Sequence, residues 1–224
     1  MTATNTHTPT LSVITRVPIP ARVDPKAVLA SLHAYEPLIK ANPYVAHFQQ
    51  RHLDVSEVVD DPLFLESGTK LQAFIVMDRV PVIPGLGAWG TKEVGIPCVM
   101  QSFEHGVRVR ANAQAGVVVR SSYEVRRRGE VLDGPDLLLG PGDEGEWELV
   151  EIAGIDCHFF VKHFVRSRFS SAHQEILQRV VDGVARKTDA AAAGVNTGLA
   201  VADAGTPAEA LPVVSSPFPA PTTL

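Results

Sequence analysis

The stretch over residues 156–187, DCHFFVKHFVRSRFSSAHQEILQRVVDGVARK, decides the fold, because its pattern predicts one long amphipathic helix. It contains no proline, and Asp156 is the expected N-cap, since its side chain can accept from the free amides of the first turn. At about 1.5 Å per residue the helix would be about 45 Å long and would need a broad apolar partner. Its apolar residues recur at the three- and four-residue spacing of one helix face: Cys157, Phe160, Val161, Phe164, Val165, Phe169, Ala172, Ile176, Val180 and Val184.

The apolar partner is predicted to be a sheet, because most of the chain before this helix reads as strands. Residues 11–19 alternate with a period of two, and short turns at His105-Gly106 and Ala115-Gly116 indicate hairpins. After the first strand, Asp24-Pro25 predicts an N-cap with proline at the first helical position, and Pro37 interrupts that helix before a second short turn. The remaining strands are expected at residues 44–55, 71–80, 91–103, 106–114, 117–126 and 146–155.

The amino-acid composition limits the classes of protein to which the chain can belong. The chain has 224 residues, 45% of them hydrophobic, which suits one domain with a core. Its net charge is −5, and the last 37 residues hold three acidic residues and no Lys or Arg, so the rest of the chain has a net charge of −2. The absence of a basic excess argues against a nucleic-acid partner. Neither a secretory signal nor an apolar run long enough to span a membrane is visible, so the expected compartment is the cytoplasm. We expect Cys98 and Cys157 to be buried free thiols.

The domain organisation follows from the same patterns. Residues 1–10 are polar and rich in threonine and are expected to be disordered. Residues 11–187 form the predicted folded domain. Residues 188–224 are rich in Ala, Thr and Pro and lack the apolar density that would offset the entropy of ordering them, so a disordered tail is expected.

The element order resembles a known superfamily. A strand, two short helices, about six further strands and a long terminal helix is similar to the START-like (SRPBCC) helix-grip fold, an α+β fold in which a curved antiparallel sheet wraps on the C-terminal helix. Within that superfamily, DPKAVLASLHAYEPLIKANP, FIVMDRVPVIPGLGAWG and WELVEIAG resemble a family of uncharacterised fungal proteins. The superfamily includes lipid-transfer domains, pollen-allergen-like ligand carriers and polyketide aromatase/cyclases. The resemblance implies a cavity for an apolar ligand between sheet and helix.

Two motifs suggest a cofactor or a metal, and neither has the context that it needs. Residues 85–90 match GxGxxG, but a strand rather than a helix follows, so we read a hairpin loop in which Trp89 covers one end of the sheet; a lid is the functional alternative. His158 and His163 lie five residues apart, which places them on different sides of a helix. We therefore expect no cofactor and no metal.

A basic strip is the third candidate site. Arg126, Arg127 and Arg128, with Arg108, Arg110 and Arg120 on neighbouring strands, would gather on one face of the sheet. The favoured interpretation is a solvated outer face. The alternative is contact with anionic lipid, so a peripheral membrane contact stays open.

The inner face of the sheet is the predicted ligand site. A tyrosine and hydroxyl groups among apolar side chains suit a pocket that orients its ligand. Asp78 and Arg79 point to opposite faces of their strand, so that one of them can enter the interior; Tyr123 and Asp78 are the catalytic candidates in case the protein is an enzyme. The predicted ligand-binding residues are Met77, Trp89, Met100, Ser102, Ser121, Tyr123, Phe160 and Phe164.

Three functions remain open from the sequence. The first is a binding protein for a lipid, sterol or polyketide-like molecule. The second is a cofactor-free cyclase, dehydratase or isomerase that acts on an apolar biosynthetic intermediate. The third is an interaction protein whose proline-rich tail recruits a partner. Whether the protein is an enzyme, and in which oligomeric state it acts, is not decided by the sequence.

Overall fold

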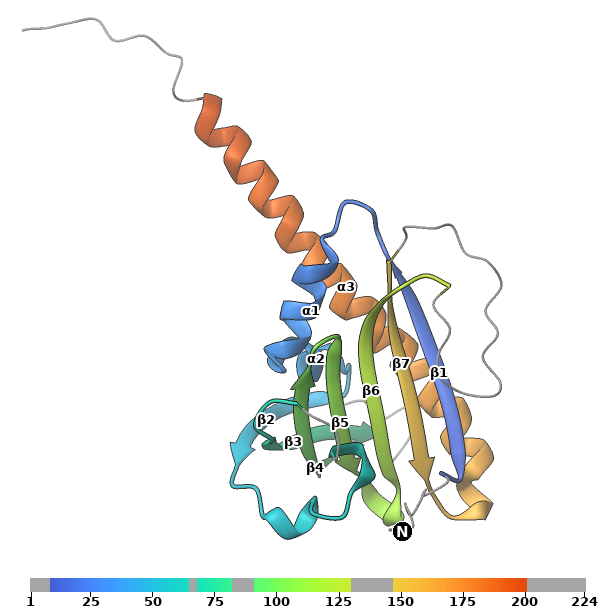
Figure 1. Ribbon diagram of the computed structural model, residues 1–224. Helices are drawn as coiled ribbons and strands as arrows, with labels where there is room; N and C mark the ends of the chain where they lie inside the picture. The colour runs from blue at the N-terminus through green and yellow to red at the C-terminus, as the bar shows by residue number, and fades with distance from the viewer. Residues whose placement is uncertain (1–8, 65–67, 82–90, 130–146, 201–224) are drawn as a thin grey trace, which may run out of the picture. The chain divides into compact units, whose positions relative to one another are not determined.

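The computed structural model describes residues 9–64, 68–81, 91–129 and 147–200 (Figure 1). The chain divides into two compact units, residues 1–188 and 189–224. In the second unit, the described residues 189–200 are helical. The fold and the site described below belong to the first unit. The predicted GxGxxG loop with Trp89 lies outside the described residues.

Seven antiparallel strands form one sheet in the order β1-β7-β6-β5-β4-β3-β2. A meander from β2 to β7 makes up most of the sheet, and β1 closes its far side by pairing with β7, Leu11 opposite Ile155. This is the predicted α+β helix-grip fold. The strands are β1 (Leu11–Ile19), β2 (Val45–Arg51), β3 (Gln72–Pro81), β4 (Thr91–Phe103), β5 (Gly106–Asn112), β6 (Val118–Arg127) and β7 (Trp147–Asp156).

Two short helices follow β1, as predicted. In α1 (Pro25–His33), the Asp24 side chain caps the N-terminus by accepting from the Lys26 amide at 2.9 Å. Pro37 lies in the first turn of α2 (Glu36–Ala41), where its missing amide hydrogen costs no helix bond. Between the helices Tyr35 has a φ of 58°, an unusual value for a residue with a side chain. Its buried hydroxyl group is fixed to Ser102 on β4, 3.0 Å from the amide nitrogen and 2.9 Å from Oγ.

The terminal helix α3 (Lys162–Ala200) begins later than predicted and continues past the predicted end at residue 187. The N-cap prediction at Asp156 is wrong, because this residue still pairs with Val118 of β6 as the last residue of β7. Its carboxylate accepts from Arg120 Nη1 at 2.6 Å and is therefore used in an ion pair. A single turn, η5 (Phe159–Val161), connects β7 to α3.

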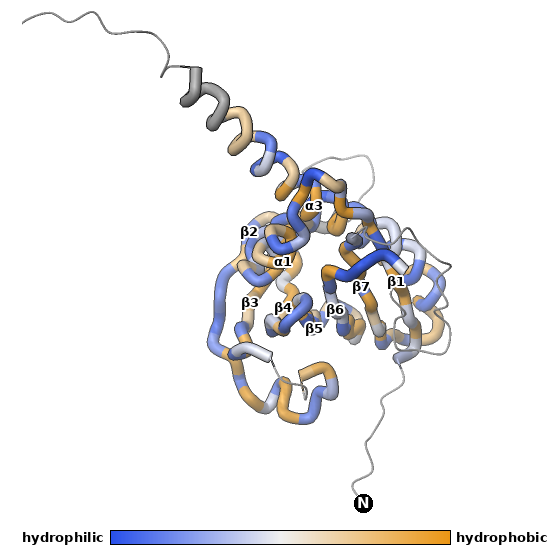
Figure 2. Tube along the Cα trace, turned by 45° about the horizontal axis from the view of Figure 1, so that its top comes forward, coloured by the Kyte–Doolittle hydropathy of each residue, from blue (hydrophilic) through white to orange (hydrophobic). Residues whose placement is uncertain are grey.

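The helix packs against one face of the curved sheet and forms the main core with it (Figure 2). Leu177 and Val181 are fully buried there, together with Leu149 of β7 and Val107 of β5. Of the positions predicted for its apolar face, Phe169, Ile176, Val180 and Val184 are buried, and Leu177, Val181 and Ala185 are buried beside them.

The opposite face of the sheet is covered by the segment that contains η1 (Val55–Glu57) and η2 (Pro62–Phe64). Asp61 of this segment is buried and pairs with Arg110 at 3.3 Å and with Arg120 at 2.9 Å. Arg126 pairs with Glu124 on its own strand, and Arg108 is buried. The basic residues predicted to form a solvated strip are thus largely neutralised or covered by acidic and apolar neighbours.

We expect Leu177→Ala to lower the free energy of unfolding by about 2–5 kcal/mol, because it removes a fully buried side chain and leaves a cavity between helix and sheet. Urea unfolding followed by circular dichroism measures this change. The neighbouring Gln178 is exposed, so Gln178→Ala is the matched control and should stay within about 0.5 kcal/mol of the unchanged protein. Equal losses in the two variants would contradict the packing of α3 on the sheet.

Candidate functional site

A cavity of about 420 Å³ lies between the first half of α3, the helix α2 and the inner face of strands β3 to β6. Its walls are mainly aliphatic and aromatic. The apolar lining residues are Leu38, Ile39, Val45, Val76, Ile96, Cys98, Met100, Val109, Ala111, Ala113, Val117, Val119, Phe164, Val165, Phe169, Ala172 and Ile176.

Strand alternation places the predicted site residues. Because successive side chains point to opposite faces, Val76 and Asp78 of β3 line the cavity, whereas Met77, which pairs with Gly95 of β4, lies on the other face. Met77, predicted as a ligand-binding residue, therefore does not line the cavity. Met100, Ser121 and Tyr123 do line the cavity, as do both catalytic candidates.

Of the remaining described residues predicted to bind the ligand, one lines the cavity and two do not. Ser102 is buried on the same face as Met100, but it bonds to Tyr35 and is not part of the cavity wall. Phe164 lines the cavity. Phe160 is exposed and does not line it, because the turn η5 has replaced the first helical turn that would have directed this side chain inward.

The polar wall of the cavity includes Ser121, Tyr123 and His173, and Glu151 of β7, whose side chain is completely buried, lies behind them. Tyr123 lies directly opposite Glu151 on β6, so both side chains share the inner face of the sheet. Ser121 Oγ donates to Glu151 Oε1 at 2.7 Å, and His173 Nδ1 of α3 lies 2.7 Å from Oε2 and 2.8 Å from Oε1. The Tyr123 hydroxyl lies 3.4 Å from the same Nδ1. This cluster joins β6, β7 and α3.

These contacts fix the protons of the cluster. A carboxylate can only accept, so the short contact assigns the proton to His173 Nδ1 and leaves Nε2 as the nitrogen with a free lone pair in the neutral ring. The hydrogen bonds that His173 makes with Tyr123 and Glu151 all use Nδ1 and leave Nε2 out. Burial, followed by the charge of Glu151 and a hydrogen bond to it, raises the pKa of Tyr123 well above its ordinary value. Tyr123 therefore remains a hydrogen-bond donor.

A second polar group lies in the wall that β3 and α2 form. Asn42 Nδ2 donates to the Asp78 carboxylate, 3.1 Å from Oδ2 and 3.3 Å from Oδ1. Burial raises the pKa of Asp78, and the bond from Asn42 opposes part of that shift. Burial, together with the charge of Asp78, raises the pKa of the Cys98 thiol to about 12, so this cysteine is an inert part of the wall.

The cavity reaches the surface at the start of α3. Phe164 and Arg168 both line the cavity and are exposed, and the Arg168 guanidinium lies 5.6 Å from the centre of the Phe164 ring. Ala113 and Val117, which flank the β5–β6 connection, also line the cavity, and Val117 packs against the same apolar cluster as Val165 of α3. These residues form the mouth of the cavity.

Sequence reasoning missed two residues of this polar cluster, Glu151 and His173. Both have a sequence signal. Glu151 lies on β7 between Leu149 and Ala153, two inward-facing residues, so it shares their face of the strand. His173 follows Phe169 by four residues and precedes Ile176 by three, which places it on the inward face of α3. A charged residue at a position where the pattern expects an inward-facing apolar residue indicates a buried polar cluster.

No group of three or more His, Cys, Asp or Glu side chains in the described ranges is arranged to hold a metal ion. Among the described helices, none combines the length and the apolar character that a membrane crossing requires. Cys98 is a buried free thiol, as predicted, whereas Cys157, also free, is only half-buried.

Comparison with protein families gives one match that covers most of the chain. A family model described as a domain of unknown function, DUF7053, matches residues 8–186. No functionally curated protein matches the chain.

Solved structures with a similar backbone have little sequence identity. The protein TTHA0849 from Thermus thermophilus has 12% identity and a TM-score of 0.44, over 81% of this chain and 99% of its own. The di-domain ARO/CYC StfQ from the steffimycin biosynthetic pathway has 10% identity and a TM-score of 0.48, over 80% and 52%. Ara h 8.0201 has 10% identity and a TM-score of 0.45, over 79% and 98%. These similarities concern the fold alone.

We expect Asp78→Asn to change how stability depends on pH. A carboxyl group with a raised pKa in the folded state holds its proton more tightly there, so its contribution to stability is present at low pH and is lost as pH rises through the folded pKa. Relative to the unchanged protein, Asp78→Asn should therefore gain stability from about pH 3.9, the unfolded value, up to the folded pKa. Urea unfolding at a series of pH values measures this difference.

Asp54→Asn is the matched control with the opposite sign. Hydrogen bonds from Ser56 lower the pKa of Asp54, so the unchanged protein should gain stability over this variant as pH rises. The same sign in both variants would contradict the burial of Asp78.

Proposed function

We propose that this chain, which belongs to the DUF7053 family, binds a small apolar molecule in the cavity between its sheet and α3. The observation that carries the proposal is the cavity itself, with a long apolar wall and a few fixed polar groups. Its volume of about 420 Å³ falls in the range of roughly 300–1,000 Å³ that small-molecule pockets occupy. A lipid, a sterol or a polyketide-like molecule belongs to this chemical class.

The polar groups suggest where a ligand would hold its own polar atoms. His173 Nε2 can accept from a hydroxyl group of the ligand, while the Asp78 carboxyl lies in a different part of the wall. The favoured ligand is therefore mostly hydrocarbon, with one or two oxygen atoms. A fully apolar molecule would leave Nε2 without a partner after the cavity had been closed to water, which costs free energy.

A side chain that fills the cavity should abolish binding. Ala172 lines the cavity on α3, so Ala172→Phe places a ring in the ligand volume; Ala30 on α1 is exposed, so Ala30→Phe is the matched control. We expect mass spectrometry of the denatured, purified protein to detect an apolar molecule that is lost from Ala172→Phe and kept in Ala30→Phe. If the protein is purified empty, binding of anilinonaphthalene sulfonate is the readout. Equal binding by both variants would exclude the cavity as the site.

A cofactor-free enzyme is the second candidate, and the pairing of His173 with Glu151 favours it. A buried carboxylate that holds Nδ1–H orients the ring and stabilises the imidazolium that forms when Nε2 takes up a proton. Nε2 would act as a general base on a carbon acid in the cavity, and the proton would return to the product in a cyclisation, dehydration or isomerisation. Tyr123 holds the cluster in place and would not itself lose its proton.

A neutral probe tests this second candidate without knowledge of the substrate. In 5-nitrobenzisoxazole a base takes the ring C–H proton, the N–O bond breaks, and the electron pair ends on the phenolate oxygen, whose absorbance is followed. We expect the protein to accelerate this elimination and His173→Gln to lower the rate by about a hundredfold. His163→Gln is the matched control, because His163 is an exposed histidine on the same helix. Equal rates for His173→Gln and His163→Gln would remove His173 as the base while leaving the binding proposal intact.

A further inference from the structure

The region around η5 and the first turns of α3 exposes large aromatic side chains. Within residues 158–168, here named the aromatic end, Phe159 is 76% exposed, Phe160 85% and Phe164 63%. Phe159 and Phe160 contact each other edge to face, with ring centres 5.9 Å apart, and Phe164 follows them by one helical turn. Clustered exposed aromatic residues on a folded domain are typical of an interaction surface.

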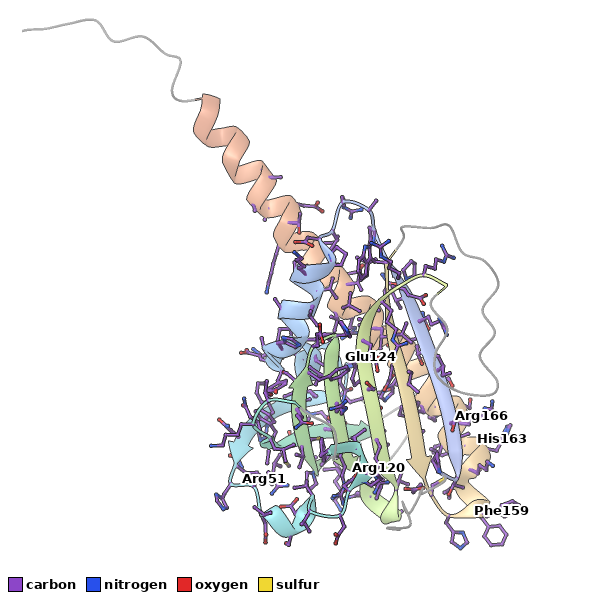
Figure 3. The ribbon with its side chains drawn as sticks, in the orientation of Figure 1. Arg51, Arg120, Glu124, Phe159, His163 and Arg166 are labelled. Carbon is purple, nitrogen blue, oxygen red and sulfur yellow. The ribbon has the colours of Figure 1, made fainter. Side chains whose placement is uncertain are left out.

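The charges of the aromatic end all have one sign. It carries Lys162, Arg166 and Arg168, and the sequence contains no Asp or Glu between residues 157 and 174. Phe159, His163 and Arg166 extend outward from this end of the domain (Figure 3). This cationic segment contrasts with the chain as a whole, whose net charge is −5.

We propose that the aromatic end docks this domain on an anionic membrane surface. Aromatic rings enter the boundary between headgroups and acyl chains, and Lys and Arg beside them reach the lipid phosphates and carboxylates with their charged ends. The arrangement of Phe159, Phe160 and Phe164 with Lys162 and Arg166 provides both parts of this interaction. A protein partner with an exposed apolar groove, or a second copy of the chain, would require a matching shape; a bilayer requires only the exposed rings and the positive charge.

The position of the aromatic end connects this surface to the cavity. Phe164 and Arg168 belong both to the aromatic end and to the mouth of the cavity, so a docked domain would open its cavity toward the lipid. An apolar ligand could then move between bilayer and cavity without crossing water. This exchange rests on the proposed ligand binding, whereas docking itself does not require a ligand.

Co-sedimentation of the full chain with vesicles tests the docking. We expect binding to vesicles of phosphatidylcholine with phosphatidylserine, and much weaker binding to phosphatidylcholine alone. The double variant Phe159→Ser/Phe160→Ser should bind the mixed vesicles about tenfold or more weakly, since two exposed rings no longer enter the interface. Val55 and Val59 are 68% and 58% exposed in the segment on the other face of the sheet, so Val55→Ser/Val59→Ser is the matched control and should bind normally.

Lys162→Gln/Arg166→Gln separates charge from aromatic insertion. This variant should weaken binding to the mixed vesicles and reduce its dependence on salt concentration. Unchanged binding by the Phe159→Ser/Phe160→Ser variant, or a protein that sediments with neither kind of vesicle, would overturn the proposal. A dimer in light scattering that this double variant disrupts would assign the surface to self-association and would also overturn it. Ligand binding measured without vesicles is unaffected by these outcomes, so the two proposals can fail separately.

Discussion

The burial of the Glu151 carboxylate is the constraint on which the inner face of the domain depends. A charged group without solvent contact is tolerated only when hydrogen bonds replace its hydration, and here Ser121 Oγ and His173 Nδ1 lie within 2.8 Å of it. These contacts come from β6 and α3, while Glu151 itself lies on β7. The carboxylate therefore fixes how far the helix can rotate or slide relative to the sheet.

This constraint accounts for the different packing of the two halves of α3 within the domain. Beyond His173, Leu177 and Val181 close completely against the sheet. Before it, Phe164 and Val165 line a cavity, and only Phe169, stacked on the His173 ring with centres 3.6 Å apart, is buried in that half. The polar cluster lies at the boundary between the part of α3 that lines the cavity and the part that packs in the closed core.

Local pattern was sufficient to predict the strands and the terminal helix, while the resemblance in element order supplied the helix-grip arrangement. Local pattern failed where a side chain makes a contact far away in the sequence. Period-two alternation identified β4 at its observed bounds, and helical spacing identified the buried face of α3. The start of α3 could not be predicted in this way, because Asp156 forms an ion pair with Arg120, 36 residues earlier, instead of capping the helix. The covering of the basic residues by Asp61 likewise depends on contacts that spacing does not reveal.

The candidate site was predictable in its apolar part and not in its chemistry. Tyr123 and Ser121 followed from the inward phase of β6, whereas pairing Glu151 with His173 requires knowing that β7 and α3 meet at that level. The sequence shows each of them as a polar residue at a position where apolar residues are expected, but it does not show that the two side chains are in contact. Because the buried Glu151 carboxylate needs a hydrogen-bond donor from His173, the two residues act as one unit, and any ligand in the cavity meets an imidazole whose Nδ1 already holds the proton.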